Sequence, residues 1–152
     1  MSQKVPNSSS ILVKDIMKKT LIFVNPKTTA YQIANMMKEG GISAIFIKEN
    51  EKFVGIITDR DFAINIGAYS LPLDTPIKKI IPETTYTIGP KDTIWQAADL
   101  MHIRNIRKIP VLDKDDVVGI ITTTDLVNNF SAATDESMRK AYSQSLSRVF
   151  GN

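Results

Sequence analysis

Apolar and polar residues follow one another along this chain in a pattern that occurs twice. The stretch 53–62 begins with an apolar run rich in β-branched residues and continues into Thr58 and Asp61, and 117–126 repeats it with Thr122 and Asp125. Such a run predicts a buried strand, and Thr followed by an acidic residue predicts a helix start. The unpaired N–H groups of the first helical turn would face the same opening as these side chains, a natural place for a polyhydroxyl or phosphate ligand.

The correspondence extends well beyond this junction, at a constant offset of about 64 positions. Gly55 corresponds to Gly119 and Ile45 to Ile109, and the matches continue without a gap through most of both copies. Agreement at one register over such a length indicates a tandem repeat of one unit. Each unit alone is marginal for a stable core, so we expect the two repeats to pack face to face into one body.

Within each repeat the pattern predicts the order helix, strand, helix, strand, strand, helix. In the first repeat these are a lead-in helix at 13–19, a strand at 21–24, a helix from Thr28 or Thr29 to Glu39, strands at 42–47 and 53–58, and a helix at 59–66 ending at Gly67. In the second they are a lead-in at 78–81, a strand at 86–88, a helix capped by Asp92, strands at 106–112 and 117–122, and a helix opened by Thr124 or Asp125. This order predicts a mixed α/β (α+β) fold with a small three-stranded sheet in each repeat and helices on one face.

These elements divide the chain into five parts. They are a flexible N-terminal tail at 1–10, a first repeat at 11–69, a linker at 70–76, a second repeat at 77–130 and a C-terminal amphipathic helix at 131–152. The last helix carries a single apolar stripe. Its periodicity leaves open whether it docks on its own chain or on the partner copy of a homodimer.

Composition restricts the class of function. The chain of 152 residues has 19 basic and 16 acidic residues, too even a balance to favour nucleic acid. It has no apolar run long enough to span a membrane and no secretory signal, so we expect a cytoplasmic protein without membrane association. With one His, no Cys and no glycine-rich phosphate loop, neither catalytic residues nor metal ligands are expected.

The doubled Gly-apolar-apolar-Thr-x-x-Asp junction and the strand Ile-Arg-Lys-Ile-Pro-Val at 106–111 resemble a pair of CBS domains, the repeats of a Bateman module, over residues 12–130. The resemblance implies repeats packed sheet to sheet with pseudo-twofold symmetry. It also implies clefts between them that bind AMP, ADP, ATP or S-adenosylmethionine. The expected protein is a non-catalytic regulator, for example in energy sensing, with no obligatory cofactor. It would form a homodimer and signal to an unknown effector protein by conformational change.

The resemblance assigns ligand contacts residue by residue. Asp61 and Asp125 would hold the ribose, which suits a carboxylate because it can accept from two vicinal hydroxyls at once. Thr58, Thr122 and Thr124 would contact the ribose or the phosphate. The adenine would lie against strand backbone and apolar side chains near Ile22, Ile42, Ile45, Tyr86, Ile106, Ile109 and Pro110.

The two clefts are expected to differ in charge. The second repeat carries Arg107 and Lys108 where the first has two small uncharged residues. In the family, basic residues at this place reach the phosphate of a nucleotide whose ribose the other repeat holds. The Asp61 cleft would therefore gather Arg60, Arg107 and Lys108, and bind a phosphorylated ligand more tightly than the Asp125 cleft, which lacks equivalent cations.

Plainer interpretations stay open beside these. A Thr-x-x-Asp sequence is commonly only a helix cap, and Arg107 and Lys108 are equally consistent with solvent-facing charges. Phe46, which stands where the second repeat has Pro110, is expected to narrow or line a cleft. The alternative function is a ligand-independent dimerisation or scaffold module, and a nucleic-acid-binding role ranks third.

Overall fold

The chain forms two compact units in the computed structural model, which describes residues 11–131 and residue 143. The expected tail at 1–10 and nearly all of the expected helix at 131–152 lie outside the described residues. One unit is Thr20–Thr85, and the other joins the described residues up to Lys19 with those from Tyr86 onward. The units are therefore not simply the two halves of the chain.

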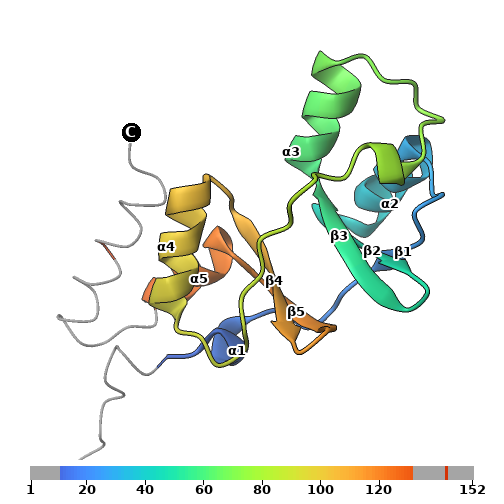
Figure 1. The fold of residues 1–152 in the computed structure, drawn as a ribbon. Helices are drawn as coiled ribbons and strands as arrows, with labels where there is room; N and C mark the ends of the chain where they lie inside the picture. Colours follow the sequence, from blue (N-terminus) through green and yellow to red (C-terminus); the bar gives the residue numbers. More distant parts are fainter. Residues whose placement is uncertain (1–10, 132–142, 144–152) are drawn as a thin grey trace, which may run out of the picture. The chain divides into compact units, whose positions relative to one another are not determined.

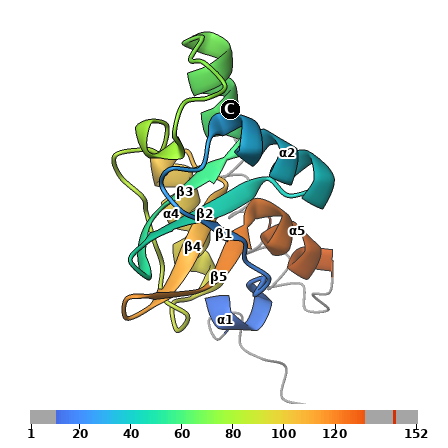
Figure 2. The same ribbon diagram turned by 90° about the vertical axis from the view of Figure 1, so that its right-hand side faces the viewer.

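The unit Thr20–Thr85 is a three-stranded sheet with helical segments (Figures 1 and 2). Its elements are β1 (Phe23–Val24), α2 (Ala30–Gly40), β2 (Ala44–Glu49), β3 (Lys52–Thr58), α3 (Asp59–Phe62), η2 (Ala63–Ala68) and η3 (Ile77–Lys79). The strand order is β1-β2-β3, with β1 parallel and β3 antiparallel to β2, as the sequence predicted. Its core consists of Ala30, Ile33, Ile45, Ile47, Ile57, Ile77 and Ile80.

The other unit repeats this plan with a shorter sheet. Its elements are α1 (Val13–Ile16), α4 (Ile94–Arg104), β4 (Lys108–Asp113), β5 (Asp116–Thr122) and α5 (Thr123–Ser131). The expected strand at 86–88 is reduced to a single parallel bridge between Ile88 and Val111. The reason lies in one amide. The Phe46 N–H donates to the Ile22 carbonyl at 2.9 Å in the first sheet, whereas Pro110 has no N–H to donate.

The two long helices begin in the same way. Thr29 caps α2 and Thr93 caps α4, and each exchanges hydrogen bonds with a Gln three residues later. The prediction that Asp92 caps the second of these helices is therefore wrong. The Asp92 carboxylate instead accepts the Gly89 N–H at 2.7 Å, which leaves the cap position to its neighbour Thr93.

The helix expected to end at Gly67 continues past it. After Asp59–Phe62 the backbone widens into the π-helical segment η2, which runs to Ala68. Gly67 does not take the left-handed conformation that ends helices; Ser70 does, at φ 54°, just before Pro72. The stop signal therefore lies a few residues later than the glycine indicated.

Each lead-in segment packs on the strands of the other repeat. Val13 of α1 is fully buried in a core with Met101 and Ile109. Ile80 of the second lead-in and Ile77, which directly precedes it, are buried with Ile45. Each lead-in was expected to pack with the repeat that follows it, but its side chains lie in the core of the other repeat. Each core is closed by a segment that lies just before the other repeat in the sequence.

The first lead-in crosses very close to β5. Lys18 and Ile120 exchange two backbone hydrogen bonds of 2.9 Å, so residue 18 extends the outer edge of this strand. The crossing depends on Gly119: a Cβ there would lie 2.5 Å from the Met17 sulfur and 3.0 Å from the Lys18 carbonyl oxygen. At the corresponding Gly55, a Cβ would meet nothing nearer than 3.5 Å.

This difference predicts opposite outcomes for the same substitution. Gly119→Ala is expected to destabilise the protein by about 1–3 kcal/mol, because the lead-in must move away from β5. Gly55→Ala is the matched control and is expected to be neutral, or to stabilise by about 0.5 kcal/mol, because Ala loses less backbone entropy than Gly. Urea unfolding of both variants measures the difference. Equal effects at the two glycines would contradict the close crossing.

Candidate functional site

The predicted strand-to-helix junction at Thr58 and Asp61 is held by a reciprocal set of hydrogen bonds. Oδ2 of Asp61 accepts from the Thr58 N–H at 2.9 Å and from the Thr58 hydroxyl at 2.7 Å. The Asp61 N–H donates to Oγ1 of Thr58 at 3.4 Å. This is a capping box, and it ties the last residue of β3 to the first turn of α3. The predicted helix start is confirmed.

The second junction has the same construction. Oδ2 of Asp125 accepts from the Thr122 N–H and hydroxyl, both at 2.8 Å, and the Asp125 N–H donates to Oγ1 of Thr122 at 3.2 Å. In both boxes Oδ2 already accepts two hydrogen bonds and the Thr hydroxyl proton is already donated. A ligand at either junction therefore finds one oxygen of the carboxylate, Oδ1, rather than two.

The expectation of unpaired N–H groups in the first turn is wrong for α3. The Asp59 N–H donates to the carbonyl of Ser43 at 3.1 Å, and the Arg60 N–H donates to Oδ1 of Asp59 at 3.1 Å. The Asp61 N–H is used in the capping box. No donor of this turn remains for a phosphate, so a phosphate at this junction would have to be bound by side chains.

The two aspartates differ in what surrounds Oδ1. Asp61 is half-buried, and among the residues that the structure describes nothing forms a hydrogen bond or ion pair with its Oδ1. Asp125 is only 5% exposed, and the ammonium of Lys18 lies 3.6 Å from its Oδ1. Sequence reasoning missed Lys18, because its place follows from the crossing of the lead-in over β5. The expectation that the Asp125 cleft lacks cations equivalent to Arg107 and Lys108 did not include Lys18 for the same reason.

An Asn four residues after each Asp helps to hold the helix that the box begins. Nδ2 of Asn65 donates to the Asp61 carbonyl, and Nδ2 of Asn129 donates to the Asp125 carbonyl, both at 2.9 Å. Asn65 also donates to the Ile80 carbonyl at 3.4 Å. The sequence signal was available, because the two asparagines stand at the same offset as the rest of the repeat.

The predicted phosphate contacts occupy the ends of these elements. Arg60 and Thr124 are exposed in the first turns of α3 and α5. Arg107 is exposed and its carbonyl accepts the Thr123 N–H at 3.0 Å, which sets its backbone at the start of α5. Lys108 is half-buried and pairs with Thr122 in the β4–β5 ladder. Which ribose these cations would accompany stays a prediction.

The residues expected around the adenine divide into two groups. Ile45 and Ile109 have fully buried side chains, each in the core of its own unit, and Pro110 is buried too. These positions can offer a ligand only their backbone. The other predicted contacts are partly exposed: Ile22, Ile42, Tyr86 and Ile106. The Tyr86 ring already carries the Arg104 guanidinium 4.7 Å from its centroid.

The expectation that Phe46 lines a cleft is wrong. Its side chain is 2% exposed. The ring lies between Phe23 and Phe53, with centroid distances of 5.6 and 6.3 Å. The parallel register pairs Phe23 with Phe46, which brings the first two rings together. Phe46 is therefore a packing residue of the first sheet.

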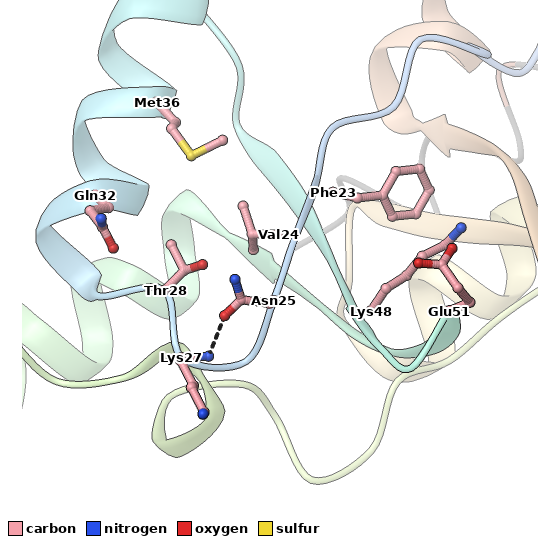
Figure 3. A pocket seen from close by; sticks show the side chains of 9 residues that line it. All are labelled: Phe23, Val24, Asn25, Lys27, Thr28, Gln32, Met36, Lys48 and Glu51. Atoms are coloured by element: carbon pink, nitrogen blue, oxygen red, sulfur yellow. Dashed lines mark hydrogen bonds between the residues drawn. The ribbon is translucent and has the colours of Figure 1, made fainter.

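A hollow of about 800 Å³ lies elsewhere on the same unit (Figure 3). It is lined by Phe23, Val24, Asn25, Lys27, Thr28, Gln32, Met36, Lys48 and Glu51, and contains none of the predicted site residues. Figure 3 shows Phe23, Lys48 and Glu51 on one side of the β1 backbone and Met36, Gln32 and Thr28 on the other. The hollow thus spreads over the edge strand and does not form an enclosed cavity.

The described part of the chain offers little else that carries chemistry. No group of three His, Cys, Asp or Glu residues within it is placed to hold a metal ion. The single histidine, His102, is exposed on α4. None of the described helices has both the length and the apolar content needed to cross a membrane.

Known proteins resemble this chain in sequence over most of its length. The CBS domain-containing protein YhcV of Bacillus subtilis is 31% identical over 117 residues, which make up 77% of this chain and 84% of that protein. The uncharacterized protein MK0525 of Methanopyrus kandleri is 30% identical over 142 residues, or 90% of this chain and 72% of that protein.

Solved structures share the fold. An uncharacterized conserved protein from Pyrococcus horikoshii matches with a TM-score of 0.77 at 23% identity, over 84% of this chain and 97% of that one. The CBS domain pair of protein MJ0100, solved with 5′-methylthioadenosine and S-adenosylmethionine, matches with a TM-score of 0.72 at 29% identity, over 80% of this chain and 96% of that one. The model of the CBS domain matches this sequence twice, at residues 13–67 and 74–132. The chain therefore belongs to the CBS domain family, as a tandem pair.

Proposed function

We propose that this chain is a non-catalytic regulatory module that binds an adenosine-containing ligand, with the ribose held at Asp61. The observation that carries the proposal is the state of that carboxylate. Its Oδ2 is fixed by the capping box, while Oδ1 has no partner among the described residues. A rigidly held acceptor at the end of a strand suits a sugar hydroxyl, because little conformational entropy is lost when the ligand binds.

The structural relatives support the same class of ligand. The MJ0100 domain pair was solved with two adenosine compounds, 5′-methylthioadenosine and S-adenosylmethionine. The 29% identity over most of both chains supports the same class of ligand for this protein, and binding measurements identify the particular compound. AMP, ADP, ATP and S-adenosylmethionine are the candidates.

Regulation would follow from differential affinity. A ligand that prefers one arrangement of the repeats shifts the population toward it, and a bound partner feels that shift. The module would act in the cytoplasm as a homodimer, with an effector protein as its target. The residues at 131–152 are a candidate for the element that meets this partner.

Ligand binding is measurable as a shift in the thermal unfolding of the protein. At a concentration about a hundredfold above its dissociation constant, a ligand should stabilise the folded protein by about 2.7 kcal/mol. We expect such a shift in thermal unfolding with at least one of AMP, ADP, ATP, S-adenosylmethionine or 5′-methylthioadenosine. No shift with any of them would reject the sensor function and favour a scaffold module. A strongly salt-dependent shift with DNA or RNA would favour a nucleic-acid-binding protein.

Two variants separate binding from helix capping at the same junction. In Asp61→Asn the amide oxygen retains the box with Thr58, while an NH₂ group replaces Oδ1. We expect nearly unchanged stability and at least about tenfold weaker ligand binding by calorimetry, since the acceptor has become a donor. In Thr58→Ala the box is lost and Oδ1 stays. The expected cost is about 1 kcal/mol of stability, with the ligand still bound. The reverse pattern would show that Asp61 is only a cap.

The contribution of Arg107 is testable by comparing ligands with and without a phosphate. Arg107→Gln is expected to weaken AMP binding about tenfold and to leave 5′-methylthioadenosine nearly unaffected, because only AMP loses a charge-assisted hydrogen bond. Lys91→Gln removes the same charge from another exposed position and serves as the control. Equal weakening for both ligands, or by both variants, would exclude a specific phosphate contact.

A further inference from the structure

We infer that Lys18 decides which of the two junctions accepts a ligand: its ammonium occupies Oδ1 of Asp125 and so closes the second ribose site, while the Asp61 site stays open. This inference rests on the proposed function, because it concerns the same kind of ligand. Lys18 would be a specificity-determining residue outside both junction motifs, in the lead-in of the first repeat.

The ion pair lies on the one carboxylate oxygen that a ribose would need. Oδ2 of Asp125 is used twice in the box with Thr122, and Lys18 stands 3.6 Å from Oδ1. The Asp125 side chain is 6% exposed, whereas that of Lys18 is 61% exposed. A buried carboxylate is poorly solvated, so the nearby cation stabilises its negative charge in place of water. A neutral sugar hydroxyl that displaced the ammonium would remove this stabilisation.

The backbone keeps the ammonium near its target. Both backbone polar groups of Lys18 are bonded, because its N–H donates to the Ile120 carbonyl and its carbonyl accepts the Ile120 N–H, each at 2.9 Å. Gly119 allows this close approach. The side chain can therefore rotate, but its origin cannot leave the edge of β5 without breaking two hydrogen bonds. The backbone therefore keeps the Lys18 ammonium close to Asp125, unlike the charge of a lysine on a mobile surface segment.

The first repeat cannot form the same closure. The residue at the position equivalent to Lys18 is Pro82, which has neither an ammonium group nor an N–H. Around Gly55 the second lead-in keeps ordinary van der Waals distances, with Ile81 and Thr85 as its nearest residues. The duplicated junctions therefore differ in access to Oδ1 although their capping boxes are nearly identical.

The test uses the full chain and 5′-methylthioadenosine, a neutral probe that reports access to the ribose site without a phosphate charge. The unmodified protein and Lys19→Met, the control at the adjacent exposed lysine, should bind a single molecule per chain by calorimetry. Lys18→Met should bind a second. In an Asp61→Asn background, the affinity should fall at least about tenfold, and Lys18→Met should raise it again by a similar factor. Adding Asp125→Asn should abolish the restored binding.

The outcomes distinguish a failure of the role of Lys18 from a failure of ligand binding at Asp61. Binding by the unmodified protein that Asp61→Asn removes and Lys18→Met does not restore would overturn the role of Lys18 alone. Weaker binding in Lys18→Met would also overturn it, because Lys18 would then assist the ligand. If the unmodified protein bound neither 5′-methylthioadenosine nor any of the other adenosine ligands, the Asp61 site would be rejected. Binding of 5′-methylthioadenosine by Lys18→Met in that case would still support closure of the Asp125 junction. Thermal unfolding of each variant establishes that it is folded.

Discussion

The whole arrangement depends on a capping box in which a strand and a helix share a single Thr and a single Asp. In each repeat the Thr ends the strand, and its N–H and hydroxyl both donate to the same oxygen of the Asp, Oδ2. The box costs the carboxylate half of its acceptor capacity and gives in return a fixed orientation. What remains is Oδ1, so structure and binding use different atoms of one side chain. Whether a junction can bind a ligand then depends on what surrounds Oδ1.

Small backbone differences break the symmetry of the duplication. Pro110 removes an N–H that the first repeat uses to hold β1, and the second sheet loses most of its third strand. Pro82, at the position equivalent to Lys18, lacks the N–H with which Lys18 bonds to β5. In both cases the side-chain pattern is nearly the same in the two repeats, and the hydrogen-bonding capacity of the backbone is not. Duplicated sequences diverge here by losing amides at strand edges, and each loss changes what a neighbouring segment can do.

These backbone differences explain which features of the structure could be predicted from the sequence. The element order and the two Thr–Asp junctions were predictable because they depend on residues close in sequence and because the duplication repeats them. The choice of Thr93 over Asp92 as a cap was not, since both are good caps and the nearby Gly89 N–H decided between them. Lys18 was beyond reach because its partner lies about a hundred residues away, across a packing exchange that periodicity does not reveal.

The same hydrogen bonds determine how ligand binding at Asp61 affects other parts of the chain. Asp61 holds the first turn of α3 through its box, and its carbonyl is tied to Asn65, which also donates to Ile80 in the second lead-in. A hydroxyl on Oδ1 favours the conformers in which the carboxylate is already held by Thr58. By linkage, whatever orders this helix then strengthens ligand binding, and the ligand strengthens the helix by the same free energy. At Asp125 the Lys18 ammonium already holds Oδ1, so a ligand there would replace an existing restraint and have less to add.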